Sequence, residues 1–314
     1  DQYFKTASGV TGLSYKKNIR TSAFLAATIA VSAERIVSHH DFVNPPDVRD
    51  SVLRYEGNPR GVTYPPILDY KFRETRISGS LNYNTRLNRF HHLELGIGLD
   101  HYLFSFLDSI RNTNWDETTF GEWRIRWNNR TTSTLIQPYV QWKFSAHKFD
   151  IVTGLHHQFF SLNNSLSIME PRIAIQYYVN GKMKVNAGFG LHSQIQQPYL
   201  YFYGSENAPD KKPIPQNKNM DFTRSRHLVA GVERQLGSDT SGIRIKLEGY
   251  YQNVYDVPID EQESSFSLIN TGADFRRLTP GKLKNEGRAR NYGLELTAER
   301  AFSSGYLFLF TGSL

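Results

Sequence analysis

Two glycine pairs have the GxG spacing that is found in some phosphate-binding loops. They are Gly96-Ile97-Gly98 and Gly188-Phe189-Gly190. A loop of that kind requires a turn from a strand into a helix, and both triplets lie inside alternating apolar and polar sequence. We therefore interpret these glycines as small positions on β-strands, facing a lumen or a packed neighbour, and predict no nucleotide site.

Two runs of neighbouring histidines offer the side chains that a metal would need. They are His39-His40-Asp41 and His156-His157. Adjacent residues of a strand point to opposite faces, so a shared metal is awkward, and polar groups of loops are the favoured interpretation. The sequence contains no HExxH motif and no nucleophile elbow. It therefore predicts no catalytic residue, no metal site and no cofactor, and the chain is not expected to be an enzyme.

Aromatic side chains in long polar connections are the best candidates for contacting a ligand, since they can stack on a sugar, a peptide or an aromatic group. The alternative is that they form a girdle at a membrane interface or pack the loops together. The predicted ligand-binding set is Trp115, Trp123, Trp127, Tyr201, Phe202 and Tyr203.

The elements that position these residues are β-strands. In residues 91–104, Leu93, Leu95 and Leu99 alternate with polar or small residues, which gives one apolar and one polar face. The same period, together with turn residues such as Asn180-Gly181, predicts about twelve strands. Their expected ranges are 8–16, 20–36, 71–86, 91–104, 132–146, 149–162, 170–179, 182–197, 222–236, 243–255, 291–302 and 306–314.

The connections between these strands alternate in length. Long ones are expected at residues 38–69, 108–130 and 198–221, with short turns between them. Outer-membrane barrels have short turns on the periplasmic side and long loops outside. The expected strands are also longer than the roughly 5–6 residues usual in soluble sheets. The fold predicted is therefore all-β: an antiparallel transmembrane β-barrel, partial, with about twelve strands of a larger barrel.

Composition fits this fold and excludes several classes. The 314 residues have a mean hydropathy of −0.51, and the longest apolar run, residues 23–31, is too short for a helix that needs about 20 residues to span a bilayer. A barrel strand needs only about 9–11. The chain has no cysteine, so disulfides are excluded. Its net charge of +7 is spread along the sequence, so no nucleic-acid partner is predicted.

Energetics decide which face of the strands meets lipid. If the polar face of residues 243–255 did so, Arg244 and Lys246 would each cost about 2–4 kcal/mol near the midplane. The apolar face must therefore point outward. The charged residues predicted to line the lumen are Arg244, Lys246, Glu248, Glu295 and Glu299.

Several segments resemble a known family. They are Glu170-Pro171-Arg172, Gly190-Leu191-His192-Ser193-Gln194, YYQNVYDVP (250–258), SSFSLINTGADF (264–275), NEGRARNYGLEL (285–296) and GYLFLFTGSL (305–314). Together they resemble TonB-dependent outer-membrane receptors of the Bacteroidetes type. The resemblance implies a plugged barrel of 22 strands that takes up a nutrient ligand with energy delivered through TonB. It also implies outer-membrane lipid, the plug domain, the TonB complex and a surface ligand-capture lipoprotein as partners.

The chain departs from that family pattern in its extent. Residues 1–314 are expected to be a single barrel region, the central part of such a receptor, with the plug domain absent and any signal peptide removed. Two alternatives stay open. One is a self-contained outer-membrane channel or embedded hydrolase. The other is a soluble carbohydrate-binding β module, for which the apolar face would be a core.

Overall fold

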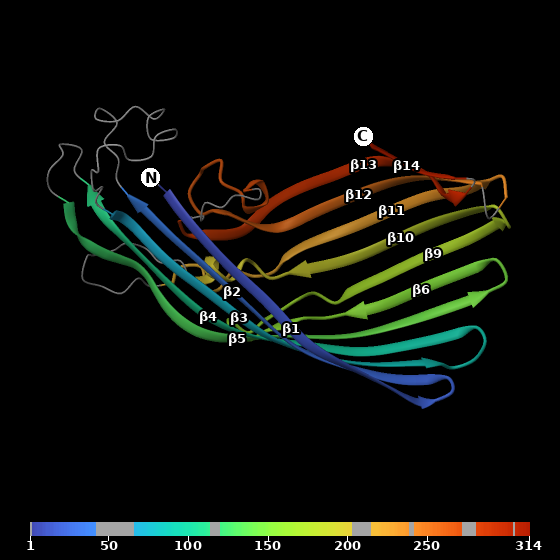
Figure 1. Cartoon of the computed structure of the whole chain (residues 1–314), viewed down its shortest axis with the longest axis horizontal. Coiled ribbons are helices and arrows are strands. Elements are labelled where there is room, and N and C mark those ends of the chain that lie inside the picture. The colour runs from blue at the N-terminus through green and yellow to red at the C-terminus, as the bar shows by residue number, and fades with distance from the viewer. Residues whose placement is uncertain are drawn as a thin grey trace.

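The computed structural model is one curved antiparallel sheet, in which the strands of the main path lie in the order of the chain (Figure 1). It describes residues 2–41, 66–113, 120–202, 215–238, 242–271, 281–303 and 305–314. Twelve strands follow one another across the sheet, and β7 and β8 form a small ribbon off this path. The strand number and the antiparallel order agree with the sequence prediction.

The strands of the main path are long. They are β1 (Gln2–Arg20), β2 (Ala23–Asp41), β3 (Pro66–Arg86), β4 (His91–Thr113), β5 (Phe120–Ala146), β6 (Phe149–His156), β9 (Glu170–Asn180), β10 (Met183–Gln194), β11 (Thr223–Leu236), β12 (Ile243–Asp260), β13 (Leu283–Ser303) and β14 (Tyr306–Ser313). The ribbon is β7 (Phe159–Phe160) and β8 (Ser165–Leu166). Within the described residues, two short helices lie in connections, namely α2 (Pro198–Phe202) and η1 (Leu268–Asn270). Among the described residues, no helix is long and apolar enough to cross a membrane.

The two ends of the sheet differ in their connections. Tight turns join β1 to β2, β3 to β4, β5 to β6 and β9 to β10 at one end, which we call the turn end. Longer segments join β2 to β3, β6 to β9, β10 to β11 and β12 to β13 at the other, the loop end. This is the alternation that the sequence predicts, and in outer-membrane barrels the loop end faces the exterior.

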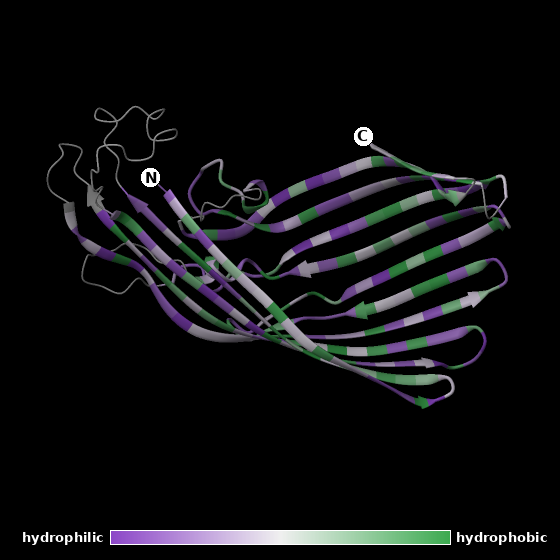
Figure 2. Ribbon diagram, viewed as in Figure 1, coloured by the Kyte–Doolittle hydropathy of each residue, from purple (hydrophilic) through white to green (hydrophobic). Residues whose placement is uncertain are grey.

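An apolar belt runs around the convex face of the sheet. Strand register carries it from one strand to the next: Val31 pairs with Ile77, Leu95 with Val140, and Leu247 with Leu296. Figure 2 shows the alternation of apolar and polar residues along these strands. Rings gather toward the turn end of the belt, where His91, Trp142 and Phe144 contact one another. A belt with aromatic residues at its edge is the lipid-facing surface of a membrane barrel.

Two expectations about loops are wrong. The long loop expected at residues 108–130 is largely strand, because β4 extends to Thr113 and β5 begins at Phe120. Trp123 and Trp127 therefore belong to β5. His39, His40 and Asp41 form the end of β2 rather than the base of a loop. In both places the backbone pairs with a neighbouring strand through most of the segment, and this pairing outweighs the polar composition.

Candidate functional site

The concave face of the sheet is polar, and it carries the five predicted lumen residues. Arg244 pairs across β12 and β13 with Glu299, and Glu248 pairs with Glu295, so all of these side chains share one face with Lys246. Arg244 forms an ion pair with Glu299, and the Lys246 ammonium lies 2.5 Å from the Glu248 carboxylate. The charged face is internally compensated along these strands. Its role in lining a closed lumen stays a prediction.

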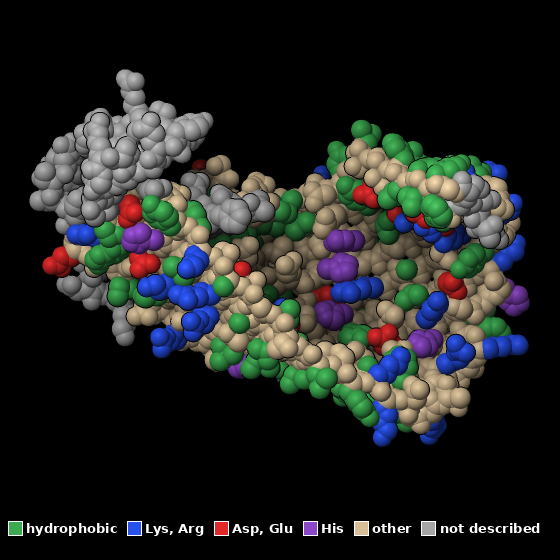
Figure 3. Space-filling model, in the orientation of Figure 1, with side chains coloured by type: hydrophobic (Ala, Val, Ile, Leu, Met, Phe, Trp, Pro, Cys, Tyr) green, Lys and Arg blue, Asp and Glu red, His purple; other side chains and the backbone are tan. Residues whose placement is uncertain are grey.

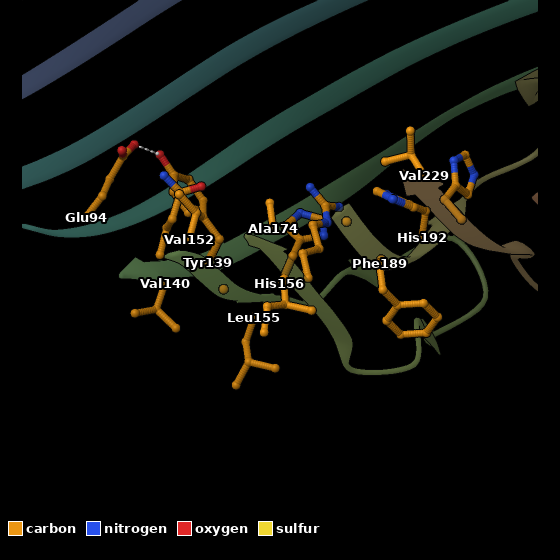
Figure 4. Close-up of a pocket in the computed structure, with 17 residues that line it drawn as sticks. Glu94, Tyr139, Val140, Val152, Leu155, His156, Ala174, Phe189, His192 and Val229 are labelled. Atoms are coloured by element: carbon orange, nitrogen blue, oxygen red, sulfur yellow. Dashed lines mark hydrogen bonds between the residues drawn. The ribbon is translucent and has the colours of Figure 1, made fainter. Parts of the chain in front are cut away.

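A recess of about 570 Å³ lies in this concave face, across β5, β6, β9, β10 and β11. Its floor consists of small residues, and its rim carries polar side chains, as Figures 3 and 4 show. The floor is made by Gly154, Ala174, Gly188 and Gly190, and the rim by Glu94, Tyr139, His156, Arg172, His192 and His227. The GxG segment at residues 188–190 thus supplies small positions on the polar face, as its alternation predicts. A Cβ on Gly190 would lie 2.9 Å from Nε2 of His192, so a larger residue there would displace the histidine.

Glu170 lies behind the rim residues His156 and Arg172 and has no exposed surface. Its Oε2 lies 2.8 Å from Nδ1 of His156 and 3.1 Å from Nη2 of Arg172. Its Oε1 accepts a hydrogen bond of 3.0 Å from the side-chain amide of Gln158, and that amide also donates to the Ser193 carbonyl at 2.7 Å. Because both carboxylate oxygens are used, Glu170 holds β6, β9 and β10 together and orients Arg172 at the rim.

Replacing Glu170 by glutamine tests this network. An amide keeps the shape of the side chain but turns a nitrogen donor toward groups that now donate to the carboxylate. We expect the Glu170→Gln change to lower the free energy of unfolding of the full-length protein by about 1.5–3 kcal/mol. Glu295→Gln, at an exposed position of the same face, should stay within about 0.5 kcal/mol of the parent. Equal effects in denaturant unfolding would show that Glu170 has no structural role.

A pair of histidines joins this recess to a second one. The rings of His192 and His227 lie 4.6 Å apart, and Nε2 of His227 lies 2.9 Å from the Gln252 amide nitrogen. The second recess, of about 460 Å³, is rich in amides and is also lined by Leu268 and Ile269 of η1. Its amide groups come from Gln194, Gln196, Gln197, Gln252 and Asn291. Among the described residues, no group of three histidine or carboxylate side chains is arranged to hold a metal. The two recesses offer hydrogen bonds rather than coordination.

The structure separates the six aromatic ligand candidates. Trp127, Tyr201 and Phe202 are buried, with exposed fractions of 0, 1 and 5%. Trp123 lies on the outer face of β5, is 42% exposed and faces the Arg111 guanidinium at 5.7 Å. Trp115 and Tyr203 lie outside the described residues. Ligand contact by any of the six stays a prediction.

The buried three belong to an aromatic cluster at the loop end of the concave face. In it, α2 packs against β3, β4 and β5. The Trp127 ring lies 5.4 Å from Phe72, and Phe202 lies 5.7 Å from Phe104. The Tyr201 hydroxyl accepts a hydrogen bond from the backbone N–H of Gln196, and burial raises the pKa of this phenol. The cluster fixes the connection between β10 and β11 against the inner wall.

Sequence reasoning did not single out Glu170, Arg172, His192 or His227 as a group. Glu170, Arg172 and His192 occur in the segments that carry the family resemblance, and His227 does not. The proximity of the four residues arises from strand register, since Arg172 pairs with Gly190 and Gly190 pairs with His227. The sequence pattern that could have indicated this group is the row of polar or small residues on one face of three neighbouring strands. It identifies the face without giving the order or register of the strands.

Comparison with known proteins gives a match of fold and none of sequence. No protein-family model and no curated protein matches the chain. Among solved structures, the outer-membrane transporter YddB from Escherichia coli aligns with 99% of this chain and 42% of its own, at a TM-score of 0.64 and 10% identity. The FrpB iron transporter from Neisseria meningitidis aligns with 96% of this chain and 42% of its own, at a TM-score of 0.62 and 16% identity. The RagAB peptide transporter aligns with 99% of this chain and 37% of its own, at a TM-score of 0.60 and 9% identity.

The fold is that of an outer-membrane transporter barrel. This confirms the fold that the sequence predicts, which is also the fold implied by the resemblance to TonB-dependent receptors. The chain spans less than half the length of each of these three proteins. The likeness is to transporters rather than to enzymes.

Proposed function

We propose that this chain forms part of the wall of a TonB-dependent receptor that moves a nutrient ligand inward across the outer membrane. The observation that carries the proposal is the concave polar face with its two adjoining recesses, set in a sheet whose convex face is an apolar belt. A wall of this kind separates a wet interior from lipid. The fold shared with the YddB, FrpB and RagAB transporters supports the same reading.

The partners in this proposal follow from the same picture. Outer-membrane lipid contacts the belt, and a plug domain of the same polypeptide fills the concavity and meets its charged lining. The TonB complex acts through that plug, and a surface lipoprotein delivers ligand at the loop end. The Bacteroidetes type of receptor is part of the proposal, supported by the motif resemblance and by the likeness to RagAB.

Ligand selection is assigned to the loop end of the concave face. There the amide-rich recess and the histidine pair lie beneath η1, and the aromatic cluster holds α2 in place. Amides and neutral histidines donate and accept hydrogen bonds without a fixed net charge. Such a lining suits a polar ligand with many hydrogen-bonding groups, such as a peptide or a chelated metal.

Uptake in living cells tests the proposal. Cells with and without the gene for the full-length protein are supplied with labelled iron chelate or labelled peptides as limiting nutrient. We expect one class to be lost on deletion, and the same loss in parent cells when a protonophore removes the inner-membrane proton gradient. Uptake that needs the gene but continues with the protonophore would instead identify a passive channel.

A further inference from the structure

Basic side chains line up across neighbouring strands on the outer face of the sheet, toward the loop end. Arg35 of β2 pairs with Arg73 of β3, Arg73 pairs with Ser105 of β4, and Ser105 pairs with Arg130 of β5. The next outward-facing row along the strands contains Lys5 and Lys71, which both pair with Val37. All of these basic side chains are exposed. We call the set Lys5, Arg35, Lys71, Arg73 and Arg130 the basic row.

The basic row faces the same way as the apolar belt. Side chains alternate between the faces of a strand, so two residues separated by an even number of positions share a face. This holds for Arg35 and Val31, for Arg73 and Ile77, and for Arg130 and Ile136. Figure 3 shows Lys and Arg side chains gathered over the left-hand part of the molecule, where β1 to β5 lie. The row therefore lies on the outer surface of the barrel wall, continuous with the belt.

The charge of the basic row is poorly compensated by the protein. Within the described residues, Arg35, Arg73 and Arg130 take part in no ion pair, and the row's only carboxylate neighbour is Asp69, 3.5 Å from Lys71. Like charges directly opposite one another on paired strands are destabilising. The direct pairing of Arg35 with Arg73 is relieved if an anion lies between the two guanidinium groups.

The height of the row puts it at the water-facing edge of the headgroup region of a membrane. Arg35 and Arg73 lie two outward-facing rows beyond the belt residues Val31 and Ile77. With a rise of about 3.3 Å per residue and a tilt of about 40°, this is about 10 Å beyond the belt. The polar layer of a bilayer extends about 5–8 Å beyond its hydrocarbon core on each side. The row therefore stands just above that layer, where its long arginine and lysine side chains can extend down to lipid phosphates.

We propose that the basic row is a binding surface for the phosphate groups of outer-leaflet lipids. Arginine binds phosphate through two parallel N–H···O bonds, and three arginines on four adjacent strands offer several such forks within about 15 Å. The acyl chains of the same lipid would lie along the belt directly below. This contact anchors the tall wall formed by β1 to β5 to the membrane surface.

Lipid binding to the purified full-length protein tests the proposal. The probe is lipid A carrying both phosphates, titrated in detergent and followed by native mass spectrometry. The triple variant Arg35→Gln, Arg73→Gln, Arg130→Gln should bind it roughly 100-fold more weakly, at about fivefold for each charge lost. The matched control removes three exposed cations at the turn end, Lys17, Arg20 and Arg89, and should bind within about threefold of the parent.

Further control experiments distinguish a lipid phosphate from free phosphate and from a second copy of the chain as the partner of this surface. Lipid A without phosphates should bind the parent as weakly as the triple variant, and millimolar inorganic phosphate should not displace the phosphorylated lipid. Replacing the three arginines by lysine should restore part of the affinity, since charge returns without the fork. Equal binding of the phosphorylated lipid by parent and triple variant would overturn the proposal. An oligomer that the triple variant breaks, with lipid binding unchanged, would assign the face to a second copy instead.

Discussion

Replacing Trp127 by alanine is expected to cost the full-length protein about 3–5 kcal/mol, the usual range for removing a large aromatic ring from a packed core. Trp127 has no exposed surface, and its ring contacts Phe72 and Tyr199 at 5.4 and 6.3 Å. The cavity would open where α2 meets the inner wall. We therefore expect the β10–β11 connection to loosen first, seen as faster proteolytic cleavage near α2 and lower stability in denaturant.

Trp123 provides a control on the same strand. It lies on the outer face and is 42% exposed, so Trp123→Ala should cost no more than about 1 kcal/mol and leave proteolysis near α2 unchanged. The comparison also separates the two roles proposed for these aromatics. A Trp127→Ala protein that keeps its stability but loses ligand would show that the ring contacts ligand and that the cluster is not a structural core.

A charge placed on the apolar belt is the second large effect. Val140 of β5 points outward and pairs with Leu95. Along the strand it lies between two parts of the belt, the rings of Trp142 and Phe144 on one side and Ile136 at the end of the belt on the other. An arginine at a lipid-facing position near the midplane costs about 2–4 kcal/mol. We expect Val140→Arg to lower stability by that amount when the full-length protein is folded into lipid vesicles, and to reduce its abundance in the outer membrane.

The neighbouring residue tests the facing in the same experiment. Gln141 points to the concave side and pairs with Glu94, so Gln141→Arg places the same charge beside a carboxylate in a wet environment. Its stability should stay within about 0.5 kcal/mol of the parent. The assignment of inner and outer faces would be wrong if Gln141→Arg were the more damaging of the two changes.

The presence of the strands and the side of each that is apolar could be predicted from the sequence, because both depend on local period. Wherever one face meets lipid and the other meets water, apolar and polar residues alternate, as they do from His91 to Leu99. The upper part of β5 could not be predicted in this way. Around Trp127 the strand lies about 50 Å from the turn after Ala146, well beyond an apolar band about 25 Å tall. From Asn128 to Thr134 the outer face is polar too, and a register shift beside Trp127 places Trp123 on the outer face, so no single alternation runs along the whole strand.

The aromatic cluster was missed for a related reason. On β4 the residues that share a face with Glu94 and Asp100 become aromatic at Tyr102, Phe104 and Phe106. The inner face of the strand therefore becomes apolar as well as the outer face, where Leu103 and Leu107 stay exposed. This is because α2 folds over the concave face and supplies the rings that cover the three aromatic residues. A single strand does not reveal that partner. The same limit applies to Glu170, whose partners come from β6, β9 and the segment between them.

Cysteine labelling in isolated outer membranes tests the central claim most directly, namely that this sheet separates lipid from a wet lumen. The chain has no cysteine, so Phe189→Cys on the outer face and His192→Cys on the concave face each add a thiol that is unique within it. We predict that a lipid-soluble maleimide labels the first and that a water-soluble, membrane-impermeant maleimide labels the second. Rapid labelling of both positions by the water-soluble reagent, or the reverse pattern, would contradict the account.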